Sequence, residues 1–151
     1  YHLRPWRWSD GHPLTARDVV SSFALFKNPV VGSPRRGTLR DVASATALDS
    51  VTVRYDLLRP QPDPVQRTWH HILPEHVTRH LDPAKVRQWP LNHQPLSSGE
   101  FILEEWAHNR SLSLLRNPAY PGRAALLDRV VFKILPEEMA EQEDRLGVQM
   151  R

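Results

Sequence analysis

Apolar and polar positions along the chain change their period several times, which predicts short helices and short strands. Residues 16–27 place apolar side chains at the spacing of one helix face. Thr15 precedes this stretch and Asp18 follows three residues later, an acidic variant of the capping box that marks a helix start. Because a proline disfavours helical backbone in the residue before it, Pro29 predicts that this helix ends near residue 27.

Alternation with a period of two predicts strands elsewhere. Residues 51–57 alternate apolar and polar side chains and pair with a weaker strand at 42–47, forming an antiparallel hairpin. Residues 101–106 and 111–116 flank the polar residues 108–110 and predict a second hairpin. The apolar run within 128–135 predicts a strand that is buried on both faces.

The remaining segments complete an α+β fold of mainly antiparallel strands and hairpins with a few short helices. An Asp-Gly pair predicts a turn at residues 8–11, because glycine supplies the positive φ that such a turn needs. The other expected elements are a strand end at 1–4, loops at 30–38 and 82–98, and short helices at 65–72, 74–81 and 137–146.

Composition narrows the possible functions. The chain has 151 residues with a formal charge of +3, and its basic residues form no run of five, so no nucleic-acid partner is expected. The sequence contains no cysteine, which excludes disulfides and zinc–thiolate sites. No apolar stretch reaches the roughly 18 residues of a membrane-spanning helix.

Residue patterns for catalysis are missing as well. Nothing in the sequence places two carboxylates around a reacting bond, and no nucleophile elbow or glycine-rich phosphate loop is present, so no enzyme is expected. Histidines 70, 71, 76 and 80 cluster, and His76 and His80 have the spacing of one helix face. No glutamate follows His76 as a metalloprotease motif requires, so partly exposed histidines are expected, with no metal and no cofactor.

Four blocks of sequence occur in a fixed order. The first contains Leu3-Arg4 and then a Trp-Ser-Asp-Gly turn that leads into a helix, and the third reads SGEF at 98–101. The full set is WSDGHPLTARDVVSSF at 8–23, ALDSVTV at 47–53 with ILPEH at 72–76, SGEF at 98–101, and LRNPAY at 115–120 with LDRVVFKILP at 127–136. Together these blocks resemble the family 5 extracellular solute-binding proteins of bacterial ABC importers.

The resemblance implies a partial lobe of a two-lobed binding-protein fold. It covers nearly all of residues 1–151, with 39–98 as a possible inserted subdomain and the second lobe absent. Both ends of the sequence read as cut, because neither a starter methionine nor a closing element is seen, so an internal fragment of the first lobe is expected.

The resemblance also marks one segment as the best candidate for ligand contact. A glycine lets a ligand approach the backbone, neighbouring hydroxyls and amides bond peptide-like groups, and an aromatic ring supplies an apolar wall. The alternative is a plain loop that enters a strand. Glu100 stands where the family usually has proline, which leaves the ligand class open. The candidate residues are Ser97, Ser98, Gly99, Glu100 and Phe101.

The function implied is the capture of a peptide or similar small solute for an ABC permease, outside the inner membrane. Membrane association is expected only through a lipid anchor or the permease. Two alternatives stay open from the sequence. One is the solute-sensing domain of a cytoplasmic transcriptional regulator with the same fold, and the other is a degenerate fragment without function. In the Trp-Ser-Asp-Gly turn, Trp8 is expected to cover the core rather than touch a ligand.

Overall fold

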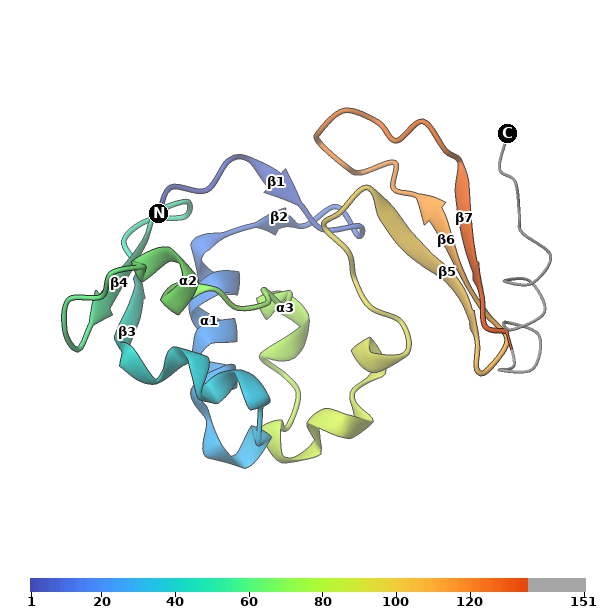
Figure 1. Cartoon of the computed structure of the whole chain (residues 1–151). Helices are drawn as coiled ribbons and strands as arrows, with labels where there is room; N and C mark the ends of the chain where they lie inside the picture. Colours follow the sequence, from blue (N-terminus) through green and yellow to red (C-terminus); the bar gives the residue numbers. More distant parts are fainter. Residues whose placement is uncertain (136–151) are drawn as a thin grey trace.

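The computed structural model describes residues 1–135 and divides visibly into two parts (Figure 1). A helical part with two small hairpins holds residues up to the loop near 92. A three-stranded sheet follows, and an extended loop joins it to the helical part. The α+β class with antiparallel pairing is therefore as predicted. No helix within residues 1–135 has the length and apolar character needed to cross a membrane.

The helix α1 (Ala16–Lys27) lies at the centre of the helical part and forms as the capping pattern predicts (Figure 1). The Thr15 N–H and hydroxyl both donate to Asp18 Oδ2, at 2.6 and 3.0 Å. The first of these bonds satisfies a backbone N–H that has no partner within the helix. At the other end the backbone becomes extended at Asn28, immediately before the proline.

One face of α1 packs against a hairpin made of β3 (Val42–Ala47) and β4 (Val53–Leu57). This confirms the first predicted hairpin, and the buried positions of α1 are those that share one helix face. The core consists of two neighbouring clusters of buried side chains, which are Ala16, Val19 and Val53 in the first and Phe23, Leu39 and Val42 in the second.

The predicted turn at residues 8–11 joins β1 (Trp6–Arg7) to β2 (Pro13–Leu14). Gly11 has φ of 88°, the left-handed conformation that glycine adopts without strain. Trp8 is only 2% exposed, so the prediction that it covers the core is confirmed.

At the chain start, residues 1–3 run antiparallel to residues 51–53. The strand end predicted at 1–4 is reduced to an isolated bridge in this segment. His2 pairs with Thr52 in that bridge. The Leu3 N–H donates to the Val51 carbonyl at 2.7 Å, and the Val53 N–H donates to the Tyr1 carbonyl at 2.9 Å.

Two predicted helices are shorter than expected. The helix α2 (Pro64–Thr68) stops before the extended residue Trp69, so the prediction of helix to residue 72 is wrong. The helix α3 (Glu75–Thr78) likewise ends before residue 81. Between them the Leu73 N–H donates to the Ser22 hydroxyl on α1 at 2.8 Å, and this long-range bond favours extended backbone over a longer helix.

Short 3₁₀ turns occupy much of the two stretches that were predicted as loops. Four of the five have proline in the first turn, where its missing N–H costs no hydrogen bond. They are η1 (Pro29–Val31), η2 (Pro34–Arg36), η3 (Thr38–Asp41), η4 (Pro83–Gln88) and η5 (Pro90–Asn92).

The sheet consists of β5 (Phe101–Ala107), β6 (Ser111–Arg116) and β7 (Arg129–Lys133), in that order and antiparallel. The second predicted hairpin is confirmed, with Asn109 at φ 59° in its turn. The expectation that the last strand is buried on both faces is wrong. Among the described residues no element covers either face of β7: the neighbouring side chains Val131 and Phe132, which point to opposite faces, are 47% and 54% exposed. The helix predicted at 137–146 lies outside the described residues.

Candidate functional site

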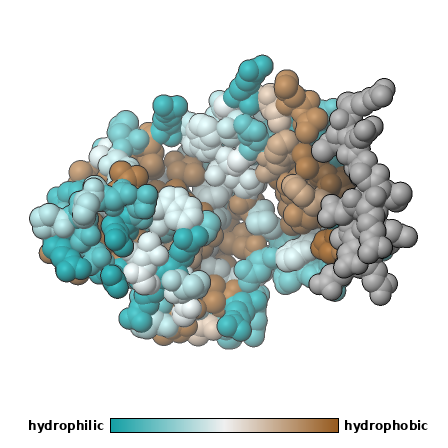
Figure 2. Space-filling model, in the orientation of Figure 1, coloured by the Kyte–Doolittle hydropathy of each residue, from teal (hydrophilic) through white to brown (hydrophobic). Residues whose placement is uncertain are grey.

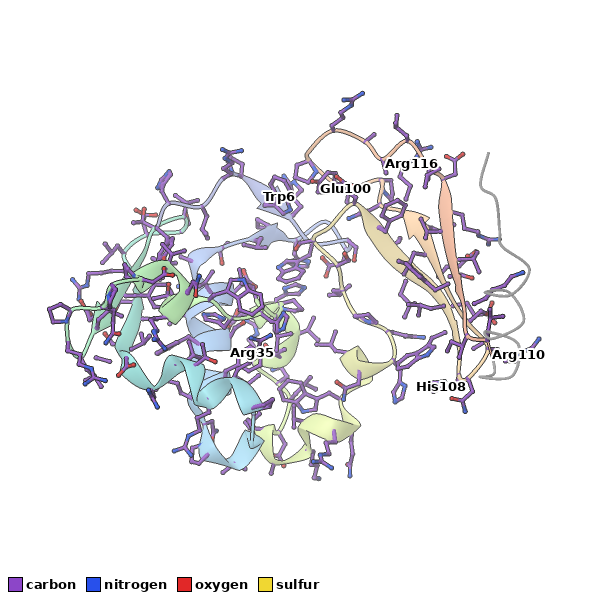
Figure 3. The ribbon with its side chains drawn as sticks, viewed as in Figure 1. Trp6, Arg35, Glu100, His108, Arg110 and Arg116 are labelled. Carbon is purple, nitrogen blue, oxygen red and sulfur yellow. The ribbon has the colours of Figure 1, made fainter. Side chains whose placement is uncertain are left out.

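The segment 97–101 connects the helical part to the sheet, and it is bonded to the β1–β2 turn (Figure 3). The Ser9 N–H donates to the Ser97 carbonyl at 2.8 Å, and the Ser97 N–H donates to the Ser9 hydroxyl at 3.2 Å. The Trp6 indole N–H donates to the Ser98 carbonyl at 2.6 Å. Ser9 in the Trp-Ser-Asp-Gly turn and Trp6 in β1 therefore fix the position of the candidate ligand segment.

A second set of bonds fixes the same segment from the sheet side. The side-chain amide of Asn117 donates to the Gly99 carbonyl at 2.8 Å, and its backbone N–H donates to the Glu100 carbonyl at 2.8 Å. The Ser97 hydroxyl donates to the Phe101 carbonyl at 2.8 Å. Asn117 is 4% exposed and was not singled out from the sequence, although it lies in the fourth family block.

Side chains, rather than carbonyls, are the groups that the segment leaves free for a ligand. Within residues 1–135 the Ser98 hydroxyl and the Glu100 carboxylate have no hydrogen-bond or ion-pair partner, and Glu100 is exposed. A Cβ built at Gly99 meets only the Ser97 hydroxyl, at 3.5 Å. The chain itself therefore does not require glycine at position 99, and the space beside it is open.

Phe101 begins an apolar wall that continues across one face of the sheet. A groove of about 600 Å³ lies between this face and the loop at 92–97. Figure 2 shows hydrophobic surface gathered over the strands of the sheet. The apolar residues that line the groove from the sheet are Phe101, Leu103, Trp106, Leu112, Leu114, Phe132 and Ile134.

A smaller cavity of about 170 Å³ lies on the helical part and contains a buried histidine. The His70 Nδ1 lies 2.8 Å from the His71 carbonyl, which only accepts, so Nδ1 carries the proton. Its Nε2 then accepts from the Tyr55 hydroxyl at 2.9 Å. Burial lowers the pKa of His70 despite the carbonyl contact, and burial raises the pKa of Tyr55 to about 12.

We expect His70 to make the protein less stable in mild acid. Below about pH 6.5 an unfolded histidine binds a proton, while the folded state resists protonation. The unfolded state then binds more protons. The free energy of unfolding therefore decreases as the pH is lowered, by at most about 1.4 kcal/mol per pH unit. Urea unfolding between pH 7 and 5 should show a shallower decline for His70→Asn. A decline equal to that of the original chain, or one that His71→Asn also reduces, contradicts this assignment.

The predicted histidine cluster does not assemble into one site. His76 and His80 do not share a helix face, because α3 ends at Thr78. His80 accepts a hydrogen bond from the Arg79 guanidinium at 2.9 Å, whereas His76 bonds to Asp10, which is distant in sequence.

Comparison with known proteins identifies the family. The sequence profile described as bacterial extracellular solute-binding proteins, family 5 middle region, matches residues 1–144. The chain belongs to this family, as its motif blocks predicted. A Brucella ovis protein named as an ABC transporter peptide-binding protein is 28% identical over 144 residues, which cover 93% of this chain and 27% of that protein. The chain thus spans about a quarter of the length of this curated relative.

Solved structures share the fold. The oligopeptide-binding protein AppA of Bacillus subtilis, in complex with a nonapeptide, matches with a TM-score of 0.86 at 23% identity, covering 97% of this chain and 30% of that one. NikZ of Campylobacter jejuni, in complex with Ni(L-His), matches with a TM-score of 0.83 at 23% identity, covering 97% and 29%. These matches confirm the predicted binding-protein fold. The boundary of a subdomain at 39–98 stays a prediction.

Proposed function

We propose that this chain is part of the substrate-binding component of a peptide-type ABC importer and that residues 97–101 form one wall of its solute site. The observation that carries the proposal is the family match over residues 1–144, together with a relative named as a peptide-binding protein. The family is one of solute-binding proteins, so the chain is assigned to binding proteins rather than enzymes.

The free groups of the segment suit a peptide. The Ser98 hydroxyl can donate to or accept from a peptide bond, and the apolar ring of Phe101 can contact a side chain. The Glu100 carboxylate, which has no cationic partner within residues 1–135, fits an ammonium or guanidinium group of the solute.

The family's description as extracellular agrees with a location outside the inner membrane. There the protein would deliver its solute to the transmembrane permease, and it would associate with the membrane through that permease or a lipid anchor. Closure of two lobes on the solute would then be a population shift, because a ligand that contacts both lobes favours the closed state.

The complete protein encoded by the gene that contains this chain tests the proposal. Thermal unfolding is measured with dipeptides, longer peptides, nickel chelates and oligosaccharides, since a ligand that binds only the folded state raises the melting temperature. A rise of several degrees with peptides supports the proposal. A folded protein that none of the peptides stabilises contradicts it, and a winged-helix segment in the complete sequence indicates the regulator instead.

Glu100→Gln is expected to weaken the binding of peptides with a free amino terminus. An exposed ion pair contributes up to about 1 kcal/mol, so a loss of roughly two- to fivefold in affinity is expected at low salt. Isothermal titration of the complete protein measures it, with Glu105→Gln on β5 as the matched control. Equal losses in the two variants, or no loss in either, exclude Glu100 from the site.

A further inference from the structure

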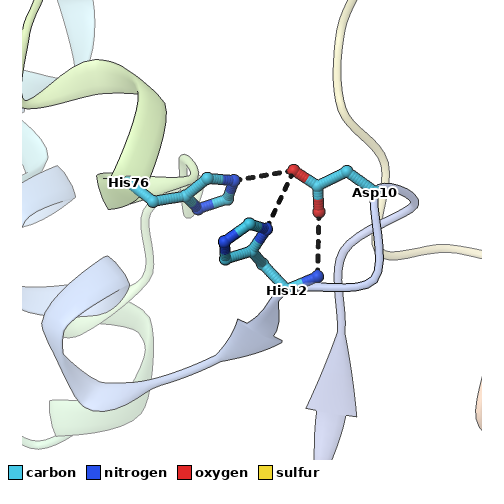
Figure 4. Close-up of side chains that lie close together, drawn as sticks. All are labelled: Asp10, His12 and His76. Atoms are coloured by element: carbon cyan, nitrogen blue, oxygen red, sulfur yellow. Dashed lines mark hydrogen bonds and ion pairs between the residues drawn. The ribbon is translucent and has the colours of Figure 1, made fainter.

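Three side chains that could bind a metal converge outside the segment 97–101 (Figure 4). Asp10 lies in the β1–β2 turn, His12 immediately precedes β2, and His76 lies on α3. Asp10 Oδ2 is 2.7 Å from His76 Nε2 and 3.5 Å from His12 Nδ1. The two imidazole rings stack, with 4.1 Å between their centroids and 13° between their planes.

The spacing of the donor atoms is close to that of a metal's coordination shell. Zinc binds imidazole nitrogen and carboxylate oxygen at about 2.0–2.2 Å, so tetrahedral donors lie roughly 3.3–3.5 Å apart. Asp10, His12 and His76 each contribute one donor atom, and these three atoms all lie within 4.8 Å of one another. Binding one ion would lengthen the 2.7 Å contact and turn the stacked rings so that their nitrogens face the same point.

The backbone on both sides of the cluster is already anchored. On one side the α3 backbone is held by the Glu75 N–H, which donates to Asp18 Oδ1 at 2.7 Å. On the other, the turn is held by the bonds between Ser9 and Ser97. The His12 N–H donates to Asp10 Oδ1 at 3.0 Å, which orients the carboxylate and leaves Oδ2 for the shared contact.

The exposure of the cluster also fits an ion. The side chains of His76, Asp10 and His12 are 20%, 29% and 60% exposed. Solvent thus reaches the cluster and can supply a fourth ligand, as in sites with three protein ligands.

We propose that Asp10, His12 and His76 bind one first-row divalent ion, with zinc as the best match. Two imidazoles and one carboxylate favour zinc, nickel or copper over magnesium and calcium, which prefer all-oxygen shells. The bound ion links the β1–β2 turn to α3 across 66 positions of sequence. This site is separate from the proposed solute wall, and it needs neither a peptide nor the second lobe.

Isothermal titration of the 151-residue chain with Zn²⁺ tests the site, because its three ligands all lie in this chain. We expect about one ion per chain and at least roughly tenfold weaker binding in His76→Asn and His12→Asn, since even the loss of a supporting contact around a metal costs this much. His80→Asn and His93→Asn are the matched controls and should bind as the original chain does. Circular dichroism checks that each variant is folded.

Three results would overturn the proposal. Equal zinc binding in His76→Asn and in the original chain places the ion elsewhere. The absence of binding at millimolar zinc means that the three side chains form only a hydrogen-bonded cluster. Competition by equimolar Mg²⁺ contradicts the assignment to an imidazole-preferring ion. Failure of peptide binding in the complete protein leaves the zinc result unaffected, so the two proposals fail independently.

Discussion

Asp18→Ala is expected to lower the free energy of unfolding by about 3 kcal/mol. Asp18 is only 3% exposed, and its carboxylate accepts the Thr15 N–H at 2.6 Å and the Glu75 N–H at 2.7 Å. A hydrogen bond to a charged group contributes about 1.5–3 kcal/mol, and alanine would leave both partly buried donors unpaired. Urea unfolding followed by circular dichroism measures the loss.

Asp63→Ala is the matched control for this variant. Asp63 also accepts an N–H at the start of a helix, that of Gln66 on α2, but at an exposed position. Loss of an ordinary N-cap costs about 1 kcal/mol. If the two variants lose equal stability, the long-range bond from Asp18 to α3 contributes nothing and the anchoring of α3 is misassigned.

Leu39→Ala is expected to destabilise the chain by about 3 kcal/mol as well. Leu39 in η3 has no exposed surface and packs with Phe23 and Val42. Its truncation removes buried methyl groups and leaves a cavity, which costs 2–5 kcal/mol for such changes. The midpoint of urea unfolding should fall, while the slope of the transition is unchanged.

Leu48→Ala makes the same chemical change at a residue that is 56% exposed. Surface changes of this kind stay within about 0.5 kcal/mol. A similar loss of unfolding free energy in both variants would mean that the cluster of Phe23, Leu39 and Val42 is loosely packed and that η3 contributes little to it.

Local patterns predicted the local structure well. The capping pair Thr15 and Asp18 located α1 to within a residue. Period-two alternation located the first hairpin, and two apolar segments that flank the turn at 108–110 located the second. The prediction was wrong where distant contacts decide the backbone. A short helix was predicted to reach residue 72, but the Leu73 N–H donates to Ser22 on α1, which favours extended backbone before it. Such a bond leaves no periodic signal in the sequence.

The same limit applies to the candidate sites. The sequence identified residues 97–101, but not that Trp6 and Asn117 bind this segment from opposite sides, because Trp6 bonds to a carbonyl 92 positions away. Asp10 belongs to a turn motif and His76 to a cluster of histidines 66 positions later, so no local pattern connects the two. Only the folded chain shows which polar groups meet.

The backbone carbonyls of residues 97–101 already accept hydrogen bonds within the chain, and this affects the entropy change when a ligand binds. Fixing one residue's backbone costs roughly 1–2 kcal/mol, and a mobile loop meets this cost when its ligand arrives. Here the Ser9, Trp6 and Asn117 bonds have already ordered the segment within the fold. If a solute contacts this segment, little of the binding free energy is needed to order the protein. The affinity is then higher than for the same contacts to a mobile loop.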